Sequence, residues 1–182
     1  SAIAAGIRRI EAVTGVVAQE MILAQAKTIQ QLKIGLNNPP NIPDAVEQLR
    51  QEVKKLEKRF ADFESERVRM LAQDIMKRAK QEQGVLIIQE QVQLESESFR
   101  NLGFELKKLA QLPYFIVLGN AFSEKAFITV MVSDELINQG LHAGKMVKEL
   151  SGIIGGGGGG QANMATAGGN IPEQLSNALS EA

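Results

Sequence analysis

The sequence predicts a mixed α+β fold, in which a long antiparallel helical hairpin precedes a small β-α-β-β-α-α globular domain. Three observations predict it. A heptad-like apolar seam runs through the first half of the chain, and a proline-rich segment at residues 37–43 interrupts helical periodicity just before that seam. Two apolar runs, residues 114–119 and 126–132, are joined by a polar turn, which is typical of a β-hairpin. The predicted segments of the chain are residues 1–15, 16–84 and 85–182.

The composition excludes several classes of protein. The chain has 182 residues, 44% of them hydrophobic, which is enough for one domain or two small ones. It contains no cysteine, so a disulfide framework, a thiolate metal site and a cysteine nucleophile are excluded. Its single histidine, His142, excludes any site that needs two imidazoles. The net charge of −1 means that any RNA contact must come from a local surface.

Hydropathy predicts no association with a membrane. No apolar run reaches the roughly 18 residues that a transmembrane helix needs, and the sequence shows no signal peptide. We therefore expect a cytoplasmic location.

The first segment, residues 1–15, is predicted to be a short strand. Apolar Ile7, Ile10 and Val13 lie among charged residues, with a glycine near each end of the segment. A strand of this length cannot bury a face alone. Two interpretations stay open: a frayed amino-terminal strand of a self-contained domain, or the last strand of a preceding domain.

The second segment predicts two helices. Apolar residues recur at steps of three and four over residues 16–36, and the prolines of residues 37–43 end that helix. Asp44 is a predicted N-cap for the next helix, with Glu47 three residues later. An antiparallel hairpin is favoured over a parallel homodimeric coiled coil, because the first helix also has an apolar stripe that needs a partner. The coiled-coil seam of the second helix consists of Leu49, Val53, Leu56, Phe60 and Phe63.

The globular segment begins with a predicted strand and helix. The apolar run Val85–Ile88 suits a buried strand. Apolar residues at helical spacing over residues 96–112 predict a helix that Pro113 ends.

The rest of the chain predicts the β-hairpin and then two helices. Apolar residues over 141–154 have helical spacing. The last helix is predicted to start near Pro172, since proline is favoured in a first turn.

A glycine-rich segment lies between the last two predicted helices. Nine of the 17 glycines fall between Gly152 and Gly169, and six of them are consecutive. Glycine exposes its N–H groups, so another backbone or phosphate groups can approach closely. No Lys-Ser/Thr follows the run, which excludes a Walker A loop, and no strand is predicted before it, which argues against a dinucleotide site. A flexible linker is possible, but Gln161–Ala165 and the second glycine pair favour a folded loop.

The segment Gly155–Gly169, with the sequence GGGGGGQANMATAGG, closely resembles the carboxy-terminal domain of bacterial alanyl-tRNA synthetases. Residues 3–15, IAAGIRRIEAVTG, resemble the closing strand of the editing domain in the same family. The two matching segments are in the family's order, with a helical hairpin and a small α/β unit between them, so the resemblance covers the whole chain. A related domain ends the DHH-type phosphoesterases. Gln161 and the lack of a metal-binding aspartate cluster argue against nuclease activity here.

The resemblance implies a non-catalytic role. In the family, aminoacylation is an ATP- and Mg-dependent class II ligase reaction, and editing of mischarged seryl- and glycyl-tRNA uses a zinc site; both lie upstream of the matching region. We therefore expect this chain to have no catalytic or metal-binding residues and no cofactor. The resemblance also implies a tRNA-binding module that holds tRNA(Ala) for aminoacylation and editing. Its partners are then tRNA(Ala) and the other domains of the synthetase. The alternative is a dimerisation module that acts through the coiled coil and the carboxy-terminal domain.

The predicted RNA contacts lie in and just before the glycine-rich segment. Lys145 and Lys148 lead into it and could reach phosphates, although two lysines on an amphipathic helix are also typical of a solvated face. Residues 85–182 carry a net charge of −4, so contact there must be local. The predicted contact residues are Lys145, Lys148, Gly156, Gly157, Gly158, Gly159, Gly160, Gln161, Asn163, Gly168 and Gly169.

Overall fold

The computed structural model describes residues 2–4, 7–8 and 11–182, and the chain divides into two compact units, residues 1–58 and 59–182. The first unit begins with β1 (Ala2–Ala4) and β2 (Ile7–Arg8), which pair in an antiparallel fashion. The predicted strand over residues 1–15 also involves positions that lie outside the described residues. The division into segments 1–15, 16–84 and 85–182 stays a prediction.

Two helices follow, α1 (Gly15–Gly35) and α2 (Ile42–Arg78). Asn37 and Asn38 lie in the connection between these helices, with φ values of 62° and 54°. Asparagine tolerates this left-handed conformation better than most residues. Asp44 was predicted as the N-cap of the second helix, but it lies inside the first turn of α2. There its carboxylate accepts a 2.7 Å hydrogen bond from the Asn41 side-chain amide.

The predicted helical hairpin is not confirmed. An antiparallel hairpin would bury an apolar stripe of α1, but α1 has no buried residue. Met21, Ile22 and Leu23 are consecutive and therefore point to different sides of the helix, so α1 presents no single narrow stripe. The predicted seam residues of α2 are also exposed, with fractions of 50%, 47%, 60%, 59% and 62% for Leu49, Val53, Leu56, Phe60 and Phe63.

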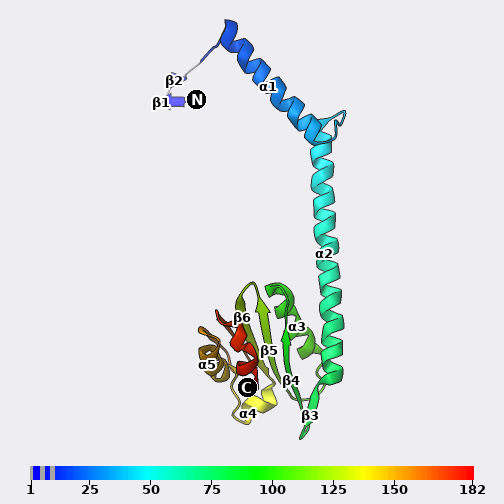
Figure 1. Cartoon of the computed structure of the whole chain (residues 1–182), viewed down its shortest axis with the longest axis vertical. Helices are drawn as coiled ribbons and strands as arrows, with labels where there is room; N and C mark the ends of the chain where they lie inside the picture. Colours follow the sequence, from blue (N-terminus) through cyan, green and yellow to red (C-terminus); the bar gives the residue numbers. More distant parts are fainter. Residues whose placement is uncertain (1, 5–6, 9–10) are drawn as a thin grey trace. The chain divides into compact units, whose positions relative to one another are not determined.

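The second unit is built around a six-stranded mixed sheet with the order β3-β4-β5-β6-β8-β7. Figure 1 labels four of these strands, β3 to β6, side by side. Strands β4 and β5 are parallel, and the other neighbours are antiparallel. The strands are β3 (Lys80–Glu82), β4 (Val85–Val92), β5 (Tyr114–Phe122), β6 (Lys125–Val132), β7 (Gly156–Gly160) and β8 (Met164–Gly169). The helices are α3 (Ser96–Leu109), α4 (Asp134–Asn138), α5 (Ala143–Ile153) and α6 (Leu175–Ser180).

The mixed α+β class is therefore confirmed, but the element order β-α-β-β-α-α is not. The sheet contains three strands that were not predicted, β3, β7 and β8. In particular, the glycine-rich segment predicted as a folded loop forms an antiparallel β-hairpin. Glycine has low strand propensity, so the pairing of β7 with β8 decides this conformation.

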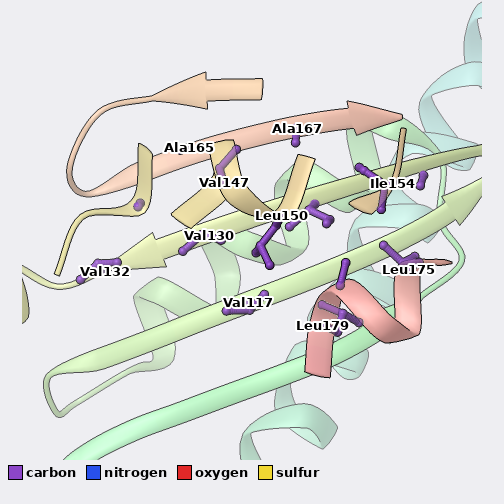
Figure 2. Packing of buried hydrophobic residues seen from close by; sticks show 14 of the residues in the cluster. Val117, Val130, Val132, Val147, Leu150, Ile154, Ala165, Ala167, Leu175 and Leu179 are labelled. Carbon is purple, nitrogen blue, oxygen red and sulfur yellow. The ribbon is translucent and has the colours of Figure 1, made fainter. Parts of the chain in front are cut away.

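The sheet separates two hydrophobic clusters because its strands alternate between faces. Ile116 and Leu118 of β5 lie in the cluster formed with α3 and the last turns of α2. Val117, between them, lies in the cluster formed with α5 and α6. Figure 2 shows the second cluster, with Val147 and Leu150 of α5 next to the strands. This unit thus has three layers, with helices on both faces of the sheet.

No helix in the described ranges is both long enough and apolar enough to cross a bilayer.

Candidate functional site

The β7–β8 hairpin forms one edge of the sheet. All five residues of β7 are exposed glycines, and the strand pairs only with β8. The turn is closed by a 2.8 Å hydrogen bond that the Gln161 N–H donates to the Met164 carbonyl oxygen. A second, of 3.0 Å, runs from the Val132 N–H to the Asn163 carbonyl oxygen and joins the turn to β6. The hairpin is therefore joined to the rest of the sheet by backbone hydrogen bonds.

Three glycines of β7 are required by the close approach of β8. A Cβ at Gly158 would lie 2.5 Å from Cβ and 2.6 Å from Cα of Ala167, and a Cβ at Gly160 would lie 2.5 Å from Cα of Ala165. A Cβ at Gly156 would collide with the Gly168 carbonyl oxygen. Because most of these neighbours are backbone atoms, no side-chain movement can relieve the clashes.

At the other two glycines of β7, Gly157 and Gly159, no neighbouring atom excludes a side chain. A Cβ at Gly157 or Gly159 would have nothing within 4 Å. These two residues pair with Gly168 and Thr166, so they face the side of the sheet opposite to Ala165 and Ala167. Glycine weakens a strand by roughly 0.5–1 kcal/mol relative to alanine. Positions 157 and 159 therefore carry a cost to stability that no contact within the hairpin explains.

A hollow of about 390 Å³ lies on this open side of the sheet, between the hairpin and the first turns of α3. Gly157 and Gly168 form part of its lining, and Phe127 of β6 lies beside them, because a Cβ at Gly168 would be 3.7 Å from the Phe127 ring. The remaining lining comes from three elements and consists of Ser96, Phe99, Arg100, Ile128, Thr129, Thr166 and Ala167.

Two hydroxyl groups lie in this lining on neighbouring strands. Thr129 of β6 is directly opposite Thr166 of β8. Thr129 is only 6% exposed, yet its hydroxyl forms no hydrogen bond with any residue in the described part of the chain. The hydroxyl oxygen itself is not fully buried, because the fully buried side-chain atoms that lack a partner among the described residues are the Ser133 hydroxyl and His142 Nδ1. The Thr129 hydroxyl is therefore available to a molecule in the hollow.

Two helices on opposite faces of the sheet carry cationic side chains beside the hairpin. Arg100 of α3 is exposed at the hollow and forms no ion pair with the described residues. Lys145 and Lys148 are exposed on α5, which packs against the other face of β7 and β8. The amino-terminal end of α5 is tied to the hairpin turn, because the Gly144 N–H donates a 3.2 Å hydrogen bond to the Gln161 carbonyl oxygen.

The predicted contact residues are thus only partly brought together. Gly157 and Gly168 line the hollow, whereas Gly156, Gly158, Gly160 and Gly169 face α5. Gln161 and Asn163 are exposed in the turn. Their role as RNA contacts remains a prediction.

Sequence analysis missed the side chains that α3 and β6 contribute to the hollow. The only signal was the i, i+2 spacing of Phe127 and Thr129, which places both on one face of a predicted strand. Nothing in the sequence indicates that Arg100 lies near the glycine-rich segment.

The first turns of α3 are held by a buried asparagine of β5. The Asn120 side chain accepts a 2.8 Å hydrogen bond from the Leu94 N–H and donates a 2.9 Å hydrogen bond to the Leu94 carbonyl oxygen. Asn120 itself has no exposed surface. This pair fixes the segment before α3, and with it the positions of Phe99 and Arg100 at the hollow.

Comparison with known families identifies the domain that carries this site. The sequence profile of the DHHA1 domain matches residues 84–182, more than half of the chain. The chain belongs to the DHHA1 domain family. The hairpin and the hollow both lie within this DHHA1 domain, whereas the buried part of α2 precedes the matched residues.

Curated relatives match almost the whole chain. It is 36% identical to an alanine–tRNA ligase of Parabacteroides distasonis over 98% of its length. Alanine–tRNA ligases of Bacteroides thetaiotaomicron and Halalkalibacterium halodurans are each 37% identical to it, over 98% and 99% of the chain. The chain spans about a fifth of the length of these relatives, 20–21%. The resemblance to alanyl-tRNA synthetases is thereby confirmed.

One solved structure extends the comparison. The C-Ala domain of the Aquifex aeolicus alanyl-tRNA synthetase is 23% identical, with a TM-score of 0.49, and the match covers 57% of this chain and 92% of that one.

Across residues 2–4, 7–8 and 11–182, no group of three or more His, Cys, Asp or Glu side chains is placed to hold a metal ion.

Proposed function

We propose that the chain is the carboxy-terminal tRNA-binding module of an alanyl-tRNA synthetase, which holds tRNA(Ala) for aminoacylation and for editing of mischarged tRNA. The observation that carries this proposal is the match to alanine–tRNA ligases along 98% of the chain. In this proposal the ATP, magnesium and zinc sites belong to other parts of a cytoplasmic enzyme. The chain itself holds no cofactor and catalyses no step.

The geometry of the hairpin supports contact with RNA. The open glycines of β7 let a sugar–phosphate backbone approach the sheet edge without meeting side chains. Arg100 on one side and Lys145 and Lys148 on the other supply positive charge close to that edge. Because residues 85–182 are acidic overall, this contact is confined to the hairpin and its flanks.

Such a module matters because the synthetase has a difficult specificity problem. A pocket that accepts alanine cannot exclude glycine by size, and it rejects serine poorly because an added hydroxyl costs little. Correct charging then depends on a second, hydrolytic site that the same tRNA must visit. A tethered module that holds the tRNA body raises the effective concentration of the acceptor end near both sites.

The direct test is the affinity of the chain for tRNA(Ala), compared with an RNA hairpin of equal length, at low and moderate salt. Replacing both Lys145 and Lys148 with alanine is expected to weaken tRNA binding and to make the salt dependence shallower. Each lost phosphate contact lowers the slope by about 0.7–0.9. Replacing Lys107 and Lys108 of α3 in the same way is the matched control and should leave both quantities unchanged. If the two RNAs bind equally at both salt concentrations, the proposal is wrong.

A second candidate function is dimerisation, and the exposed seam of α2 favours it. Five apolar side chains at heptad spacing lie in solvent on one helix, which is the pattern of a coiled-coil interface. If this seam joins two copies, Leu56→Lys should convert a dimer to a monomer in sedimentation velocity. Lys58→Glu, on the side of the helix away from the seam, should leave the dimer intact. A wild-type chain that is monomeric at all concentrations would contradict this candidate.

A further inference from the structure

We propose that the hollow beside the β7–β8 hairpin is a binding site for a single unstacked nucleobase of an RNA strand. This inference rests on the proposed RNA-binding function and adds the chemical class of the group that the site accepts. Its size of about 390 Å³ is within the range of small-molecule sites.

The lining supplies the two kinds of contact that bind a base. Phe127 and the Arg100 guanidinium offer planar surfaces, on which nucleobases stack regardless of their identity. Thr129 and Thr166 offer hydroxyl groups that can donate or accept hydrogen bonds at a base edge. The Thr129 hydroxyl has no hydrogen bond within the described residues and is open to the hollow, so the edge of a base can pair with it.

The glycines explain how a base reaches this lining. Gly157 and Gly168 pair across the two strands, so no side chain stands between the sheet edge and the Phe127 ring. A strand backbone can therefore lie along β7 while one of its bases enters the hollow. This accounts for the glycine at position 157, where a side chain would meet no atom of the protein within 4 Å.

A base that is stacked and paired within a duplex cannot enter the hollow. The site therefore favours single-stranded RNA, or a loop whose base is turned outward, over a regular duplex. We expect this site to add only a small part of the total RNA affinity. It accepts one base, and Arg100 is the one cationic side chain among the residues that line it.

The test uses Gly157→Val, whose side chain would project into the hollow. Gly152→Val is the control: it lies at an exposed position of α5, a Cβ there also has nothing within 4 Å, and it does not line the hollow. Phe127→Leu is a second variant, which keeps an apolar side chain but removes the aromatic plane. Circular dichroism and the thermal midpoint establish that each variant is folded.

The probes are a fluorescent 12-nucleotide single-stranded RNA of mixed sequence, the same RNA annealed to its complement, and tRNA(Ala). For the wild-type chain we expect the single strand to bind more tightly than the duplex. Gly157→Val and Phe127→Leu are each expected to weaken single-strand binding about tenfold, in line with the loss of one stacked base. Gly152→Val is expected to change it less than threefold.

The outcomes separate this inference from the proposed function. If the wild-type chain binds tRNA(Ala) but Gly157→Val and Phe127→Leu leave the affinity for every RNA unchanged, the base site is wrong and the tRNA-binding role stands. If the wild-type chain binds none of the three RNAs, both fail. If Gly157→Val instead changes only the oligomeric state, the hollow contacts protein and the inference is overturned.

To separate a base within RNA from a free nucleotide, the four nucleoside monophosphates are titrated while the Thr129 and Thr166 methyl signals are followed by NMR. Shifts at both threonines that are absent in Gly157→Val support a site for the base itself. Shifts elsewhere only, together with unaltered RNA binding in the variants, would overturn it.

Discussion

Gly156→Ala is expected to lower the free energy of unfolding of the DHHA1 domain by about 2–3 kcal/mol. The new Cβ would collide with the Gly168 carbonyl oxygen and lie 2.5 Å from the Gly169 Cα. Both neighbours belong to the backbone of β8, so the two strands must separate to accommodate one methyl group. Because α5 packs on this hairpin, its separation also loosens the packing of Val147 and Leu150. Urea denaturation followed by circular dichroism measures the change.

Gly157→Ala is the matched control, one residue further along the same strand. Its Cβ has nothing within 4 Å, and replacing glycine reduces the conformational entropy of the unfolded chain. We therefore expect stability to be unchanged or to rise by roughly 0.4–1 kcal/mol. Equal destabilisation by the two alanines would contradict the alternation of required and open glycines.

Asn120→Ala is expected to lower the free energy of unfolding by about 2–4 kcal/mol. It removes two hydrogen bonds, each with a net contribution of about 1 kcal/mol. It also leaves the N–H and carbonyl groups of buried Leu94 without their partner, which adds a desolvation penalty. Since this pair fixes the segment before α3, single-stranded RNA binding should weaken as well.

Asn101→Ala, at an exposed position of α3, is the control and should change neither stability nor RNA affinity. Chemical denaturation gives the stability of both variants, and fluorescence anisotropy with the 12-nucleotide RNA gives the affinity. An Asn120→Ala chain as stable as the wild type would show that the Leu94 backbone finds other partners.

The sequence was sufficient to predict the central strands and most helices of the globular domain. Strands β5 and β6 are runs of β-branched and aromatic residues, whose preference for an extended backbone agrees with their burial on both faces. The hairpin β7–β8 could not be predicted in this way, because six identical glycines carry no periodicity. Only the partner strand distinguishes Gly156 from Gly157.

The helical region shows a second limit of sequence reasoning. An apolar seam such as that through Leu49 and Leu56 predicts that a helix has a partner, but the same pattern serves a partner in the same chain or in another copy. The structure leaves this seam exposed, so the question becomes one of oligomeric state.

The hollow was beyond sequence reasoning for a geometric reason. Its lining comes from α3, β6, β7 and β8, and Arg100 and Gly157 are far apart in the chain. They meet because β6 pairs with β8, and β8 with β7, on one face of a sheet that α3 covers only in part. The glycine-rich segment itself was predicted to contact RNA, and the structure adds the side of the hairpin on which that contact is sterically open.

Hydrogen–deuterium exchange of the chain with and without tRNA(Ala) tests the central claim most directly, because it locates the RNA without substituting any residue. The proposed function predicts slower exchange over residues 156–169 when tRNA is bound. Residues of β4 and β5, in the interior of the sheet, should be unaffected. Bound tRNA that protects only α1 and the first turns of α2, with no change in the hairpin, would contradict it.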